Sequence, residues 1–436
     1  MNRMEETKEK RGILVSVCEK GKDKEASDSL DELERLLETA GGTAAARVIQ
    51  AREKPDAATC VGSGKLSEIS ELCRSLDCRL VVFDCELTPA QIRNCEDGID
   101  VEVSVIDRSM LILDIFALHA ESSAGRLQVE LAQLKYTAPR LRGKGKDMSR
   151  LGGGVGTRGP GESRLETDRR HLKERCRALE EELKKTESVR MTQRAARDRS
   201  GICKCAVVGY TNAGKSTLLN TLTGAGVLAE NKLFATLDPV TRQLDLPGGS
   251  TVLLTDTVGF IKKLPHHLVK AFKSTLEEAV FADILLIVAD ASDPFVAEQT
   301  ALTEKTLCEL GAEGKPRLLL FNKWDVTDED TRCALAASAK ASGTECCFIS
   351  ALTGEGLDEA LAAIERIARD RKKPVTLNVP FSESGAVNTA YKLLEGVTVE
   401  YTDDGIRIFG IASAESAGKL ARYIENYDTV FPKIET

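Results

Sequence analysis

The segment Gly209–Thr217 is the sequence feature that most restricts the fold of this chain, because it reads Gly-Tyr-Thr-Asn-Ala-Gly-Lys-Ser-Thr. The apolar run Cys205–Val208 precedes it and Leu218–Asn220 follows it. A buried strand, a glycine-rich loop and a helix start, in that order, form the context that the phosphate-binding pattern G-x-x-x-x-G-K-[S/T] requires. Gly209 and Gly214 allow the backbone to curl, so that successive N–H groups point at phosphate oxygens. A plain glycine turn does not account for this context.

We expect the whole loop to contact the phosphates of a nucleotide. Lys215 reaches the β and γ oxygens and stabilises transition-state charge, and the Ser216 hydroxyl ligates Mg²⁺. Asn212 has two readings: it helps to hold a K⁺ ion that spreads transition-state charge, or it bonds its own backbone. The predicted contact residues are Gly209, Tyr210, Thr211, Asn212, Ala213, Gly214, Lys215, Ser216 and Thr217.

A second motif, Asp256-Thr257-Val258-Gly259, follows the apolar run Thr251–Leu254. An aspartate at a strand end can hold Mg²⁺ through a water molecule, while the glycine N–H meets the γ-phosphate. In many GTPases a glutamine follows this glycine and orients the attacking water. Here the next residue is Phe260, which cannot do so. We therefore expect slow unaided hydrolysis that a partner accelerates.

A third motif, Asn322-Lys323-Trp324-Asp325, selects the base. The Asp325 carboxylate can accept hydrogen bonds from N1–H and the 2-amino group of guanine, and adenine offers neither. An unpaired buried polar group costs roughly 1–3 kcal/mol, so the motif favours GTP and GDP over ATP. We expect Asn322 to brace the loop and the Lys323 stem to pack on the base. Ser350-Ala351-Leu352 supplies a backbone N–H for the guanine O6.

We expect a mobile switch segment between the phosphate loop and Asp256. Phe234-Ala235-Thr236-Leu237-Asp238 contains Thr236, the best candidate for a second Mg²⁺ hydroxyl. Thr241 is the alternative.

The rest of the chain indicates a multidomain α/β protein. We divide it into an N-terminal parallel α/β domain (1–121), a helical hairpin (122–200), a P-loop GTPase domain (201–371) and a small α+β C-terminal domain (372–436). In the first, apolar runs predict strands over 12–17, 46–50, 79–83 and 101–105, and helical periodicity covers 29–39, 66–76 and 89–95. Residues 61–66 faintly resemble a second phosphate loop, but the motif's first glycine is missing, so we predict a turn before a helix. The C-terminal region predicts strands over 397–400 and 405–409 and a helix over 413–423.

The hairpin carries the main charge anomaly. Two leucine-rich helical patterns flank the glycine-rich segment 142–162, which contains Arg142, Lys144, Lys146 and Arg150, although the chain has a net charge of −8. Such a segment cannot bury a core, but its backbone can approach a phosphate surface closely. We interpret these four residues as RNA contacts; a solvated linker is the alternative. The charged start and the lack of any long apolar run predict a cytoplasmic protein with no membrane span. We also expect a monomer.

Several segments together resemble one family. The three nucleotide motifs look like the translation-factor branch of GTPases. Segments 107–116, 127–133, 149–154 and 156–162 resemble the HflX family of ribosome-associated GTPases; the family usually has Thr where this chain has Val240. The resemblance implies a GTPase that binds the large (50S) ribosomal subunit and its rRNA and, in some members, splits or rescues ribosomes. A ribosome-assembly or RNA-modification GTPase, and a regulatory switch with a protein partner, are the alternatives.

Overall fold

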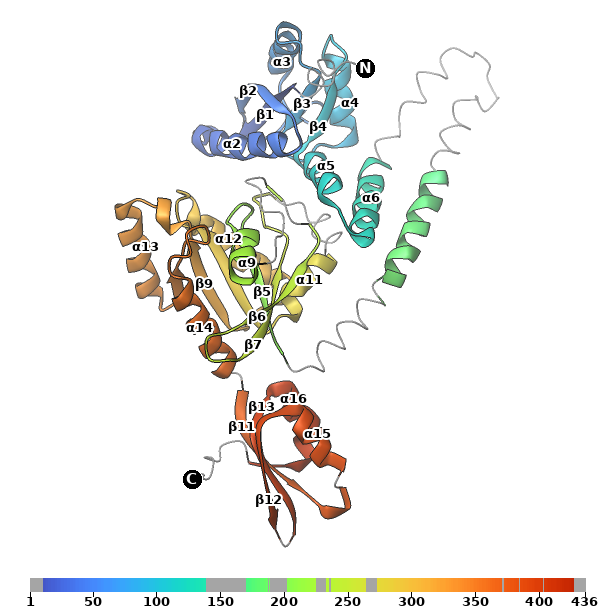
Figure 1. The fold of residues 1–436 in the computed structure, drawn as a ribbon. Coiled ribbons are helices and arrows are strands. Elements are labelled where there is room, and N and C mark those ends of the chain that lie inside the picture. Colours follow the sequence, from blue (N-terminus) through green and yellow to red (C-terminus); the bar gives the residue numbers. More distant parts are fainter. Residues whose placement is uncertain are drawn as a thin grey trace.

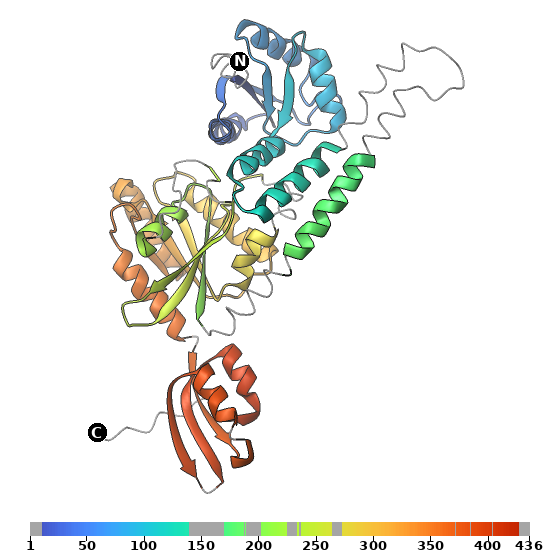
Figure 2. The ribbon, with the colours of Figure 1, turned by 45° about the vertical axis from the view of Figure 1, so that its right-hand side comes forward.

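The computed structural model describes residues 11–138, 170–186, 188, 202–224, 233–234, 237–263, 273–370, 372–383, 385–402 and 404–426. These residues form three units that each contain a sheet, with a pair of helices beside the first two (Figures 1 and 2). The predicted multidomain α/β class is confirmed. Within the described ranges, no helix is both long and apolar enough to cross a membrane.

The N-terminal sheet is parallel, with the order β2-β1-β3-β4. Its strands alternate their side chains between two cores, so that Leu14 faces one helix layer and Ile13 and Val15 face the other. Helices α2 and α5 cover the first face, and α3 and α4 cover the second. The bounds are β1 Arg11–Cys18, α2 Asp23–Thr39, β2 Thr43–Ala51, α3 Ser63–Ser75, β3 Leu80–Phe83, α4 Pro89–Gly98, β4 Ser104–Asp107 and α5 Arg108–His119.

Three details differ from the predictions for this domain, and a fourth agrees with them. The strand predicted over 101–105 is misplaced, because pairing with β3 begins only at Ser104. Helix α5 carries no amphipathic signal and was not predicted, since apolar side chains lie on all its sides, even where Leu118 is 64% exposed. Helix α2 begins six residues before the predicted 29–39. The turn predicted at 61–66 is confirmed, because Gly62 is the N-cap of α3.

Two helices lie side by side next to the N-terminal and GTPase domains (Figures 1 and 2). One is α6, Ser123–Thr137, and the other spans 170–186. Arg175 pairs with Glu130 at 2.8 Å and Lys135 pairs with Glu180 at 2.8 Å, while Leu179 is fully buried. The RNA-contact candidates Arg142, Lys144, Lys146 and Arg150 lie outside the described residues, so their role stays a prediction.

The GTPase sheet has the order β10-β9-β8-β5-β7-β6, and only β6 runs antiparallel. Helices α9 and α14 share one core with the sheet, and α11, α12 and α13 lie on the other face. The bounds are β5 Cys203–Gly209, α9 Lys215–Thr223, β6 Val240–Asp245, β7 Thr251–Asp256, α11 Lys273–Phe281, β8 Ile284–Asp290, α12 Val296–Glu309, β9 Arg317–Asn322, α13 Glu329–Ser342, β10 Cys346–Phe348 and α14 Leu357–Asp370.

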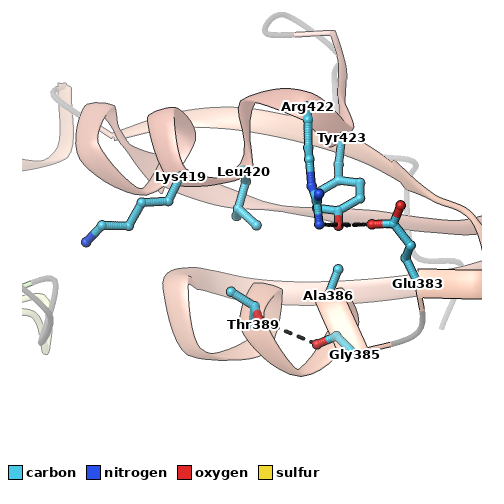
Figure 3. A pocket seen from close by; sticks show the side chains of 8 residues that line it. All are labelled: Glu383, Gly385, Ala386, Thr389, Lys419, Leu420, Arg422 and Tyr423. Carbon is cyan, nitrogen blue, oxygen red and sulfur yellow. Dashed lines mark hydrogen bonds and ion pairs between the residues drawn. The ribbon is translucent and has the colours of Figure 1, made fainter.

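The C-terminal unit is an antiparallel sheet, β12-β13-β11-β14, packed against α15 and α16. A cavity of about 460 Å³ lies beside these helices. Figure 3 shows that Arg422 and Tyr423 point toward Glu383, which bonds the Tyr423 hydroxyl at 2.5 Å. No residue of the nucleotide motifs lines this cavity. The bounds are β11 Lys372–Val379, α15 Gly385–Leu393, β12 Leu394–Thr402, β13 Gly405–Ser413, α16 Ala414–Leu420 and β14 Ile424–Asn426.

One hydrophobic core crosses from the N-terminal domain into the GTPase domain. Phe116 of α5 meets Phe234 edge-on, with ring centroids 4.8 Å apart, and Phe260 is buried in the same cluster. The two domains therefore share packing at the end of the GTPase sheet where the nucleotide motifs lie.

Candidate functional site: the nucleotide-binding loops

The predicted phosphate loop has the backbone that such a loop needs. It starts at the end of β5 and runs into α9. Gly209, Asn212 and Gly214 have φ values of +150°, +61° and +93°, which turn the chain tightly enough for several N–H groups to face one point. A side chain at Gly209 would collide with the Val288 backbone carbonyl. The strand, loop and helix expected from sequence are confirmed.

Lys215 lies inside this loop. It is 7% exposed, and its ammonium donates to the carbonyl oxygens of Tyr210 at 2.8 Å and Gly209 at 3.3 Å. Burial lowers the pKa of Lys215 to about 8, and the nearby Asp256 carboxylate partly offsets this effect. The lysine is thus a buried cation that an anionic ligand would stabilise.

A hydroxyl and a carboxylate meet at the start of α9. The Ser216 Oγ donates to Asp256 Oδ2 at 2.7 Å, and the Asp256 side chain is fully buried. Register explains the approach, because Asp256 at the end of β7 pairs with Val207 of β5. Hard oxygen ligands of this kind suit Mg²⁺, so the residues present fit the predicted metal.

The motif that ends at Gly259 lies directly against the phosphate loop. The N–H of Phe260 donates to the Gly209 carbonyl at 3.0 Å, and the Thr211 N–H donates to the Phe260 carbonyl at 2.8 Å. A Cβ on Gly259 would lie 2.8 Å from the Thr211 Cα and 2.9 Å from the Lys215 Nζ, so only glycine fits against the phosphate-loop backbone. The Phe260 ring is 2% exposed and lies in the shared core, which leaves it no access to a water at the γ-phosphate.

The predicted base-recognition segments are joined by one side chain. Asn322 donates from Nδ2 to the Ala213 carbonyl at 2.8 Å and accepts from the Ala351 N–H at 2.8 Å. It therefore braces the phosphate loop against the Ser350–Leu352 segment, as expected. The Lys323 ammonium pairs with Asp290 at 2.5 Å, a partner that the motif does not reveal. Trp324 and Asp325 follow in a short 3₁₀ turn with no buried side chain.

Asp238 contacts the hairpin, which the sequence did not reveal. Its carboxylate accepts from the Ser122 N–H at 2.7 Å, the Glu121 N–H at 3.1 Å and the Ser122 hydroxyl. Ser122 is the N-cap of α6. Ala235 and Thr236 lie outside the described residues, so their predicted contacts remain untested. The alternative metal hydroxyl, Thr241, bonds the Thr255 hydroxyl at 3.0 Å.

Comparisons with known proteins agree with this geometry. Family models described as GTP-binding GTPase N-terminal, GTP-binding GTPase Middle Region and 50S ribosome-binding GTPase match residues 27–117, 119–197 and 204–323. GTPase HflX of Lacrimispora saccharolytica is 48% identical over 413 residues, which cover 95% of this chain and 96% of the relative. The chain belongs to the HflX family. It is therefore a GTP-binding protein that hydrolyses GTP.

Other relatives extend the likeness. GTPase HflX of Caldanaerobacter subterraneus subsp. tengcongensis is 44% identical over 95% of this chain and 94% of its own length. That of Escherichia coli (strain K12) is 40% identical over 88% of each chain. A solved complex of SsGBP with GDP covers 82% of this chain and 99% of its own, at 27% identity and a TM-score of 0.47.

Proposed function

We propose that this HflX-family GTPase binds the large ribosomal subunit in a nucleotide-dependent way and helps to split or rescue ribosomes. GTP and Mg²⁺ order the Phe234–Asp238 segment, and this fixes the hairpin in a subunit-binding conformation that hydrolysis releases. The observation that carries the proposal is the contact between Asp238 and Ser122. It ties the segment expected to sense GTP to the first residues of α6, which leads toward the basic segment 142–162.

The same proposal assigns the nucleotide contacts. Lys215 binds the β- and γ-phosphates, Ser216 and Thr236 ligate Mg²⁺, Asp256 holds the ion through water, and Asp325 reads guanine. When bound, Mg²⁺ would neutralise charge between the phosphates. Potassium near Asn212 remains a separate prediction. Calorimetry with GDP, GTP and ATP tests the assignment, and equal heats for ATP and GTP would contradict it.

The family description supports the ribosomal partner. One family model that this chain matches is described as 50S ribosome-binding GTPase. The HflX GTPases that resemble this chain do so over most of their own length. The glycine-rich, basic segment 142–162 suits binding to RNA phosphates, because such binding depends on positive charge and on close approach of the backbone.

Sedimentation tests ribosome binding. The protein is mixed with separated 30S, 50S and 70S particles, with GDP or a non-hydrolysable GTP analogue. We expect co-sedimentation with 50S particles, stronger with the analogue, and loss of it when Arg142, Lys144, Lys146 and Arg150 are changed to Ala.

A matched control removes the same charge elsewhere. It changes four exposed cations of the GTPase and C-terminal domains to Ala, namely Lys305, Lys340, Arg369 and Lys392. This control should sediment with 50S particles like the parent. If the loop variant does so too, the basic segment is not the contact. Binding to none of the three particles would instead favour the assembly alternative or a protein partner.

A further inference from the structure

A buried ionic cluster in the N-terminal domain lies beside the nucleotide loops. The Arg108 guanidinium bonds the Asp84 carboxylate at 2.7 Å and also the Glu32 carboxylate. The side chains of Arg108 and Asp84 are each 2% exposed, and that of Glu32 is 16% exposed. Burial opposes the charge on Arg108, but the two carboxylates outweigh it and raise the pKa of the guanidinium. We call these three residues the N-domain cluster.

Two side chains of the GTPase domain complete this cluster. The Tyr210 hydroxyl, from the phosphate loop, donates to Glu32 and accepts the Lys262 N–H at 2.7 Å. The Lys263 ammonium bonds the Asp84 carboxylate and lies 2.9 Å from the Ser29 Oγ. The Lys263 side chain is 51% exposed, whereas its partner Asp84 is 2% exposed. Burial and the Glu32 charge raise the pKa of Tyr210, so its hydroxyl keeps its proton and remains a donor.

The charge balance of the cluster stabilises Lys263 in this position. Glu32 and Asp84 carry two negative charges, whereas Arg108 supplies one positive charge, and Lys263 supplies the second. Without it, a carboxylate in a nearly dry site would lack full compensation, which is costly. Lys263 also has a φ of +54°, a conformation that non-glycine residues rarely adopt and that the surrounding contacts must maintain.

The segment from Gly259 to Lys263 is held along its length. Phe260 makes two backbone hydrogen bonds to the phosphate loop, and the Lys262 N–H bonds the Tyr210 hydroxyl. The position of the Gly259 N–H therefore depends on where the Lys263 end is anchored. Stabilisation of transition-state charge requires donors that are already in place, so the anchor matters for catalysis.

We propose that the N-domain cluster positions Gly259 for GTP hydrolysis, and that it acts through Lys263 and Tyr210. Glu32, Asp84 and Arg108 are then positioning residues, since they act through Tyr210 and Lys263. The inference rests on the proposed nucleotide site and on the expectation that the Gly259 N–H meets the γ-phosphate. It can be tested without ribosomes.

Two adjacent lysines provide a matched experiment. Lys263→Met removes the cation of the cluster. Lys262→Met keeps the backbone N–H that bonds Tyr210 and removes the same charge from a pair with Glu298, in which the ammonium and carboxylate lie 2.9 Å apart and the side chains are 34% and 65% exposed, so that the carboxylate partner is buried only to a small extent. The Lys262 ammonium also lies 4.6 Å from the Phe295 ring centroid, a contact outside the N-domain cluster. The full-length protein is assayed without ribosomes for kcat, KM for GTP and affinity for GDP. Lys263→Arg tests rescue by a retained charge.

We expect Lys263→Met to lower kcat at least about tenfold, because small displacements of a reacting group cost up to about a hundredfold. KM and GDP affinity should stay within about twofold, since ground-state binding does not use the lost contact. Lys262→Met should match the parent, and Lys263→Arg should recover most of the rate. Equal kcat for the two methionine variants would overturn the inference, as would a parallel loss of GDP affinity and kcat in Lys263→Met.

A second variant decides the matter if Lys263→Met fails to fold. Tyr210→Phe removes only the hydroxyl that joins Glu32 to Lys262. A fall in kcat at unchanged GDP affinity supports the inference, and an unchanged kcat overturns it. Failure of the parent protein to bind GDP would instead contradict the proposed nucleotide site.

Discussion

Replacing Phe260 with glutamine would place the usual water-orienting side chain after Gly259, yet we expect it to damage the protein. The ring is 2% exposed in the core that joins the N-terminal and GTPase domains. Loss of a buried phenylalanine costs about 3–5 kcal/mol when it becomes alanine. Glutamine refills part of that volume but buries an amide, which costs about 1–3 kcal/mol without a partner. A net destabilisation of about 3–5 kcal/mol follows.

Thermal unfolding and GTP turnover measure the effect. For a domain of this size each kcal/mol shifts Tm by about 2–4 °C, so Phe260→Gln should lower Tm by about 6–20 °C. Phe281→Gln is the matched control, because Phe281 lies in α11 of the same domain and is 49% exposed. Turnover of Phe260→Gln should not exceed that of the parent. A variant as stable as Phe281→Gln that hydrolyses GTP faster than the parent would refute this reasoning.

Three further predictions concern the nucleotide loops. Asn322→Ala leaves the Ala351 N–H and the Ala213 carbonyl without their partner, which costs about 1–3 kcal/mol for each group. The affinity for GDP, measured by calorimetry, should therefore fall at least about 30-fold, and a change under threefold would contradict the bracing role. Burial lowers the pKa of Lys215 from 10.5 to about 8. Between pH 8 and pH 10.5 the nucleotide-free folded protein therefore binds fewer protons than the unfolded chain, so its free energy of unfolding should rise with pH over this range. Phosphate binding restores the charge, so GDP binding near pH 9 should take up about one proton, seen as a buffer-dependent heat; no uptake would contradict it. Replacing Na⁺ with K⁺ should raise turnover several-fold if Asn212 helps to hold the ion, and equal rates would dismiss that reading.

Local spacing made the nucleotide loops predictable. A phosphate loop needs its glycines, lysine and hydroxyl at fixed separations, so Gly209 to Ser216 could be assigned before any tertiary contact was known. The bracing role of Asn322 followed in the same way and is confirmed by its two hydrogen bonds. The partners of Asp238 and Lys263 could not be predicted, because they lie 116 and 179 residues away and depend on how two domains pack.

Helix α5 shows why the packing was hidden and what it implies. Its apolar residues lie on every side, including Leu118, which is 64% exposed, so its sequence lacks the stripe that reveals a surface helix. The reason is its position, because one core contains α5, the α2 face of the N-terminal sheet, and Leu233, Phe234 and Phe260 of the nucleotide segments. The buried side of α5 therefore contributes to an interface between two domains. It follows that the boundary near residue 121 divides the chain but not the packing, and that movement of the nucleotide segments must repack α5.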